Sequence, residues 1–122
     1  MAQCIIAKYK FDKNIYASLI PTFNSGFTDY TYTDEIDIDG HTIRTISNDS
    51  GSLPTNIVFS SNASSNIAKS LLSVEYINTG NLITMREMFD GCISLVSVNA
   101  SSIDTTNIKN MSCMFRSCSS LT

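Results

Sequence analysis

The C-terminal part of the chain carries one pattern of apolar and polar positions twice, with a period of 26 residues. The matched pairs are Met85 and Met111, Met88 and Met114, Phe89 and Phe115, Cys92 and Cys118, Ser94 and Ser120, and Leu95 and Leu121. A fixed period of this size is typical of proteins built from stacked structural units. Such units form binding surfaces and scaffolds more often than catalytic pockets.

Within one repeat, the apolar spacing predicts a short helix followed by an extended segment. Positions i, i+3, i+4 and i+7 share one helix face and are occupied by Met85, Met88, Phe89 and Cys92. Gly91 lies where this helix would end, a position that often needs a left-handed backbone. A weaker, earlier copy is visible at residues 70–74, which resemble residues 94–98 at an offset of 24.

The N-terminal residues predict a strand, a short helix and a hairpin. Alternation over residues 3–11 is typical of a half-buried strand, with one apolar face made of Ile5, Ala7, Tyr9 and Phe11. Asp12 is a suitable cap for a short helix through Ile15 and Leu19, which Pro21 ends. Residues 57–59 form a short apolar run that predicts a buried strand.

The hairpin prediction depends on the Asp39-Gly40 pair, which favours a two-residue turn with positive φ at both central positions. That turn would place Ile36 opposite Ile43, and Glu35 opposite Arg44. Apolar side chains would then pair on one face of the hairpin and opposite charges on the other.

Together these elements predict an α+β fold in two parts. Residues 1–66 would form an N-terminal capping region with a β-hairpin and a short helix. Residues 67–122 would form a short leucine-rich-repeat solenoid of strand plus short helix, incomplete at its C-terminal side. A lone repeat has too few apolar positions to offset the entropy of ordering it, so each needs neighbours. We therefore expect the chain to continue with more repeats or to dock its free edge on another molecule.

Composition narrows the possible partners. The net charge is −3 and there is no basic patch, so nucleic acid is not an expected partner. No apolar run reaches the roughly 18–20 residues of a membrane span, and no secretory signal is visible at the N-terminus. The four cysteines include no Cys-x-x-Cys pair, so they do not indicate a metal or redox motif.

The candidate chemistry along the chain is weak. Residues 35–40 alternate acids and end in Gly, as a calcium loop begins, but the twelfth position of that loop is Ile46 and the flanks predict strands. Cys92 and Cys118 are either stacked buried thiols or a disulfide between neighbouring repeats. His41 is the only histidine and flanks a turn, so a Cys–His catalytic pair is not indicated. The sequence thus predicts no catalytic, cofactor-binding or metal-binding residues.

The repeat resembles the BspA-type leucine-rich repeat of bacterial surface proteins, whose units begin Met-x-x-Met-Phe-x-x-Cys-x-Ser-Leu. The positions that match it in register are Met85, Met88, Phe89, Cys92, Ser94, Leu95, Ser101, Asp104, Thr105 and Met111. Asn99 and Thr106 depart from the family's acid and Ser. The N-terminal portion resembles, more loosely, the heads of repeat proteins encoded in Gram-positive bacteria and their phages. The resemblance implies surface display, adhesion and protein–protein contact, and brings no catalytic residues.

These observations predict a non-enzymatic protein-binding or adhesion module with no cofactor, located on a cell surface, outside the cell or on a virion. Its partner would be a protein or a cell-surface ligand. An alternative is a structural protein, for example a minor phage component, whose open repeat edge drives self-association.

Overall fold

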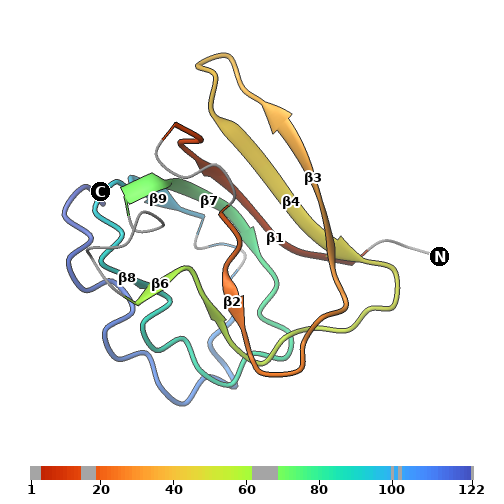
Figure 1. The fold of residues 1–122 in the computed structure, drawn as a ribbon. Helices are drawn as coiled ribbons and strands as arrows, with labels where there is room; N and C mark the ends of the chain where they lie inside the picture. The colour runs from red at the N-terminus through yellow and green to blue at the C-terminus, as the bar shows by residue number, and fades with distance from the viewer. Residues whose placement is uncertain (1–3, 15–18, 62–68, 100, 102, 122) are drawn as a thin grey trace.

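The computed structural model describes residues 4–14, 19–61, 69–99, 101 and 103–121. Short strands and tight turns account for nearly all of them (Figure 1). The strands are β1 (Cys4–Phe11), β2 (Thr22–Phe23), β3 (Thr31–Ile36), β4 (Thr42–Asn48), β5 (Ile57–Val58), β6 (Ser60–Ser61), β7 (Leu71–Ile77), β8 (Phe89–Asp90) and β9 (Ser97–Val98).

The main sheet is mixed and has the strand order β3-β4-β1-β7-β9. The central strand β1 runs antiparallel to both β4 and β7, whereas β7 and β9 are parallel. Two-stranded pairs, β2 with β5 and β6 with β8, lie beside it. Figure 1 shows the β3–β4 hairpin projecting at the top and the repeat segments winding at the lower left.

Strand β1 confirms the predicted strand but not all of its predicted face. Ala7, Tyr9 and Phe11 are fully buried, as alternation requires. Ile5 is 40% exposed, and its neighbour Ile6 is buried instead. The cause is a register shift in the pairing with β4 between Ile5 and Ala7, because a bulge transfers the side chains before it to the opposite face.

The hairpin is confirmed, but its predicted register is wrong by one residue. Asp34 lies opposite Arg44, and Glu35 lies opposite Ile43. The loop spans five residues rather than two, because the Asp37 N–H donates to the His41 carbonyl. Asp37 also accepts hydrogen bonds from the N–H groups of Asp39 and His41 at 2.9 Å each, which stabilises the longer loop.

The predicted α+β fold, with a leucine-rich-repeat solenoid of strand plus short helix, is wrong. The described residues form a nearly all-sheet structure around the mixed five-stranded sheet. Residues 86–88 and 112–117 are turns. The N–H groups of Met85, Glu87 and Phe89 donate to the neighbouring repeat, so they are not available to a helical ladder. Positive φ angles at Glu87 (59°) and Cys113 (58°) also interrupt a right-handed helix.

Two other predictions concern chain organisation. The expected helix after Asp12 falls mostly on residues 15–18, outside the described residues; Leu19 to Pro21 are described and are not helical. The division into regions 1–66 and 67–122 stays a prediction. Strand β1, before that boundary, and strand β7, after it, pair directly in one sheet.

The hydrophobic core joins the main sheet to the repeats. Tyr9 of β1 packs edge-on against Phe59, with ring centroids 5.0 Å apart. The Tyr9 hydroxyl donates to the Leu19 carbonyl, so the buried phenol is satisfied. Burial raises the pKa of Tyr9 well above its ordinary value, and the phenol stays neutral.

Arg44 is the main buried charge of the sheet, at 3% exposure. Its guanidinium donates twice to the Asp34 carboxylate, with both N–O distances 2.7 Å, and once to the Leu19 carbonyl at 3.2 Å. It also lies over the Tyr32 ring, 4.1 Å from the centroid. The bond to Asp34 is the largest influence on the pKa of Arg44, which is raised. This network fixes the outer strand β3 to β4.

Arg44→Ala is expected to lower the free energy of unfolding by about 3 kcal/mol, because it removes one partner of a largely buried ion pair. Arg44→Lys should lie in between, since an ammonium cannot make the paired contact with a carboxylate. Urea unfolding measures both. The control is Glu75→Ala, which removes the solvated Lys8–Glu75 pair and should cost less than about 1 kcal/mol. Equal losses for Arg44→Ala and Glu75→Ala would contradict this role for Arg44.

Candidate binding surface

The two repeats lie against each other through backbone hydrogen bonds. We call residues 81–95 the inner rung and residues 107–121 the edge rung. Alternate N–H groups of the inner rung donate to alternate carbonyls of the edge rung: Met85 to Asn110, Glu87 to Ser112, Phe89 to Met114, and Gly91 to Arg116, over 2.7–3.0 Å. The sequence period therefore appears in space as a register between neighbouring rungs.

Each rung closes on itself through the same set of tight turns. In the inner rung, Met88 donates to the Met85 carbonyl and Asp90 to the Glu87 carbonyl; in the edge rung, the equivalent bonds join Met114 to Met111 and Arg116 to Cys113. The turns need left-handed residues at equivalent places. These are Glu87 and Cys113 at one position, and Gly91 (φ 77°) and Ser117 (φ 62°) at the other.

A column of phenyl rings passes through the rungs. Phe59 stacks on Phe89 with centroids 5.4 Å apart, and Phe89 stacks on Phe115 with centroids 5.6 Å apart. Phe59 and Phe89 are buried, while Phe115 is 42% exposed. The column thus begins under the main sheet at Tyr9 and ends at the surface of the edge rung.

Phe59 is a member of this column that the repeat pattern did not predict. Its N–H donates to the Met88 carbonyl, just as the Phe89 N–H donates to the Met114 carbonyl. Strand β6, which follows it, runs parallel to β8. The missed signal is a Phe 30 residues before Phe89 rather than 26. The weak copy at offset 24 does correspond in space, since Ser73 and Val74 pair in parallel with Ser97 and Val98.

An ion pair links the two rungs beside the column. Arg116 donates to both carboxylate oxygens of Asp90, at 3.0 Å and 2.6 Å. Asp90 is buried, whereas the Arg116 side chain is 59% exposed. The hydrogen bond to Asp90 is the first cause of a raised pKa at Arg116, so the guanidinium stays charged. The edge rung therefore neutralises a buried carboxylate of the inner rung.

The outer side of the edge rung carries backbone donors without acceptors. In the part of the chain that the structure describes, no hydrogen bond involves the N–H groups of Met111, Cys113, Phe115 and Ser117. They are equivalent to the inner-rung donors that the edge rung satisfies. We call these four groups the donor edge. Met111, expected in the core, is 49% exposed here, and Phe115 lies beside it.

The cysteines of the two rungs are free thiols, so the disulfide alternative is wrong. Cys92 is fully buried. Burial, with smaller contributions from Cys118 and Asp90, raises the pKa of Cys92 to about 12. Burial also raises the pKa of Cys118, whose thiol donates to the Phe89 carbonyl at 3.0 Å. These groups fill space and satisfy a carbonyl.

The hairpin loop brings the predicted calcium-loop acids close to His41. One ligand atom from each of Asp37, Asp39 and His41 lies within 4.8 Å of the others. However, Lys10 is 3.1 Å from the Asp37 carboxylate, and backbone N–H groups take its other oxygen. Desolvation opposes ionisation of Asp37, but the bonds from His41 and Lys10 outweigh it and lower its pKa. The ammonium of Lys10 already occupies the place of a cation.

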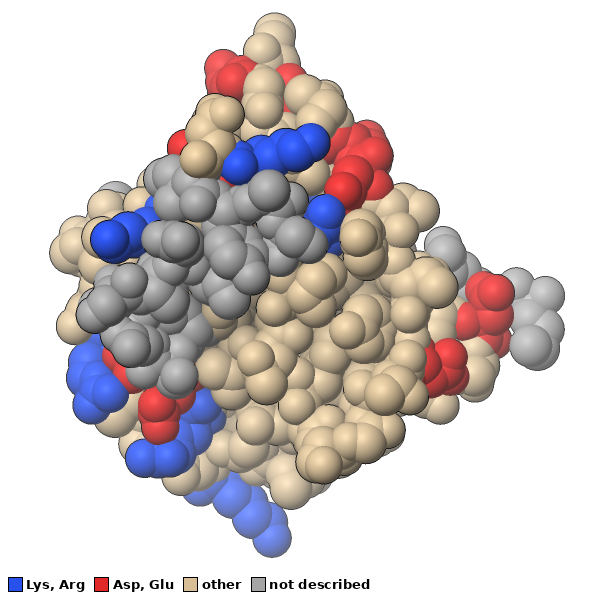
Figure 2. Space-filling view, in the orientation of Figure 1, with Lys and Arg blue, Asp and Glu red and all other residues tan. Residues whose placement is uncertain are grey.

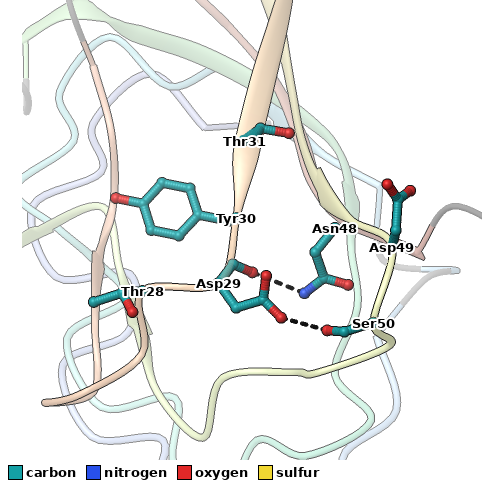
Figure 3. Close-up of a pocket in the computed structure, with 7 residues that line it drawn as sticks. All are labelled: Thr28, Asp29, Tyr30, Thr31, Asn48, Asp49 and Ser50. Atoms are coloured by element: carbon teal, nitrogen blue, oxygen red, sulfur yellow. Dashed lines mark hydrogen bonds between the residues drawn. The ribbon is translucent and has the colours of Figure 1, made fainter.

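A hollow lies between the start of β3 and the end of β4 (Figure 3). Its polar groups hold the loop together: Asn48 donates to the Asp29 carbonyl at 2.9 Å, and the Ser50 hydroxyl donates to the Asp29 carboxylate. Figure 3 shows Tyr30 pointing away from Asn48 and Ser50. These side chains do not converge on a common point, so the hollow has the features of a loop support rather than a reaction centre.

The charges of the rungs differ. Residues 107–121 contain Lys109 and Arg116 and no acid, whereas residues 81–95 contain Arg86, Glu87 and Asp90. Figure 2 shows Lys and Arg atoms at the lower left, where Figure 1 places the repeats. None of the helices formed by the described residues has the length and apolar character to span a membrane.

A small β protein whose sequence repeats lie in register is the class that this fold defines. The chain belongs to the family described as "Mycoplasma protein of unknown function, DUF285", whose family model matches residues 23–122. Comparison with curated proteins and with solved structures gives no match. The match covers the hairpin as well as both rungs.

Gly91→Ala is expected to lower the free energy of unfolding by roughly 1–2 kcal/mol, because the buried turn holds this residue at a φ of 77°. The equivalent change in the opposite direction, Ser117→Gly, should leave stability unchanged or raise it by less than about 1 kcal/mol, since relief of strain is offset by backbone entropy. Urea unfolding of the two variants gives the comparison. A neutral Gly91→Ala would contradict the left-handed turn.

Native Cys92 is expected to resist a disulfide-exchange reagent at pH 8, while the partly exposed Cys4 and Cys113 react first. Because its pKa is raised from 9.0 to about 12, the folded state favours the protonated thiol. The corresponding stability is complete below pH 9 and is lost as the pH rises toward 12. Cys92→Ala should remove this loss between pH 9 and 12 in thermal unfolding. Rapid native labelling of Cys92 would contradict its burial.

Proposed function

We propose that this protein is a non-enzymatic protein-binding or adhesion module built on BspA-like repeats. The main support is the edge rung, which exposes Phe115, Met111 and a row of backbone donors. Monomeric proteins seldom leave such groups together on a surface unless a partner covers them. The Met-x-x-Met-Phe-x-x-Cys pattern adds support, since this repeat resembles the one in bacterial surface proteins.

The proposal includes location. We infer that the module is displayed on a cell surface, released outside the cell or carried on a virion, where adhesion is useful. Its ligand would be a protein or another cell-surface molecule. The apolar groups at the edge would supply affinity, and the donors would fix the orientation of the partner's backbone.

Adhesion is tested with the purified chain on immobilised fibronectin, laminin, collagen and mucin, using biolayer interferometry. We expect saturable binding to at least one of them. Phe115→Asp and Met111→Asp should each weaken it by about tenfold or more, which is about 1.4 kcal/mol. Ile38→Asp is the matched control, because Ile38 is fully exposed at the distant hairpin loop. Its affinity should equal that of the parent chain.

Two results would count against the proposal. One is the absence of saturable binding to every surface of the panel. The other is equal weakening by Phe115→Asp and Ile38→Asp, which would separate binding from the edge rung. Circular dichroism of each variant establishes that the fold is kept, so that lost binding is assigned to the surface.

A further inference from the structure

The edge rung is chemically one-sided. Every carbonyl of residues 110–118 already accepts a hydrogen bond within the chain, either from the inner rung or from a tight turn. The donor edge, in contrast, has four N–H groups that no described residue accepts. The surface can therefore donate backbone hydrogen bonds but has few free lone pairs to offer in return.

This asymmetry disfavours pairing of the edge with itself. Two copies that met through their edge rungs would place donors against donors. A head-to-tail arrangement would need a free acceptor face on the second copy, but residues 55–59 cover the far side of the inner rung. There, the Ile83 N–H donates to the Thr55 carbonyl, and the Phe59 N–H donates to the Met88 carbonyl. The described part of a second copy has no matching face.

We propose that the donor edge binds an extended, acidic, aromatic-bearing segment of a different polypeptide, which runs parallel to the edge rung. The inference rests on the proposed function and names the chemistry of its partner. The inner rung shows how such a surface is covered: by alternate carbonyls, a stacked phenyl ring and one ion pair. The partner segment supplies the same three features in the next layer.

Charge selects an acidic partner over a neutral one. The edge rung carries Lys109 and Arg116 and no carboxylate of its own. Arg116 is bound to Asp90 on one side, yet its side chain is 59% exposed, so it can also receive an acid from the other side. A basic segment at the same place would repel both cations.

The test tethers a probe segment to the donor edge. A copy of residues 97–122 is added after Thr122, with Asp in place of the copied Arg116. The tether raises the local concentration of the segment, so that docking does not depend on finding a natural ligand. One comparison protein keeps the copied arginine. The other carries Ser in place of the copied Met114 and Phe115.

Amide hydrogen exchange reads the donor edge directly. In the Asp extension, exchange at Met111, Cys113, Phe115 and Ser117 should slow by at least about tenfold relative to the parent chain. The extension that keeps arginine should slow it less, and the Ser extension should leave it unchanged. Amides of the hairpin loop at Asp37–His41 are the internal control and should not change. Raising the salt concentration should reduce the difference between Asp and Arg.

Two outcomes would overturn the inference. In one, exchange at the four amides is as fast in the Asp extension as in the parent chain. In the other, the parent chain forms a dimer in sedimentation analysis that Phe115→Asp abolishes, which means that the edge pairs with itself. A negative adhesion panel would leave both readings unaffected, because no natural ligand takes part in this experiment.

Discussion

The register between neighbouring rungs is the constraint on which the rest of the structure depends. An alternate N–H group that points out of the turn in one rung meets a carbonyl of the next, and the phenyl rings stack only in that register. Neither interaction suffices alone. A rung of this length buries too little apolar surface to order its backbone, and its outward donors would be left without partners. Each rung is therefore stable only beside another layer.

The main sheet supplies the first layer. Phe59 stands against Tyr9 of the central strand on one side and against Phe89 on the other, so it connects two kinds of structure. The sheet itself is held at its outer strand by the Arg44–Asp34 pair. Strands β7 and β9 continue the sheet in parallel beside the rungs. The chain thus progresses from an antiparallel hairpin to parallel layers without a change of core.

The candidate site was only partly predictable. The period of 26 residues identified the matched side chains, and Phe89 and Phe115 do stack. The position of Phe59 escaped because its spacing differs, and the Asp90–Arg116 pair escaped because the two positions differ in sign between repeats. The donor edge could not be read from side chains at all, since it consists of backbone groups. Met111 has the same pattern as the buried Met85 but is exposed, because no rung covers it.

The sequence by itself determined the repeat unit, its period, the strand at residues 4–11, the hairpin and the early copy at offset 24. It did so because side-chain periodicity and turn residues report local structure and burial directly. Tertiary structure decided the rest. The i, i+3, i+4, i+7 spacing indicated a helix, but hydrogen bonds to the next rung took the N–H groups that a helix needs. The hairpin register moved by one residue when the Asp37 carboxylate accepted two N–H groups of the loop. Both outcomes depend on which partner a backbone donor finds, and one-dimensional patterns do not specify that partner.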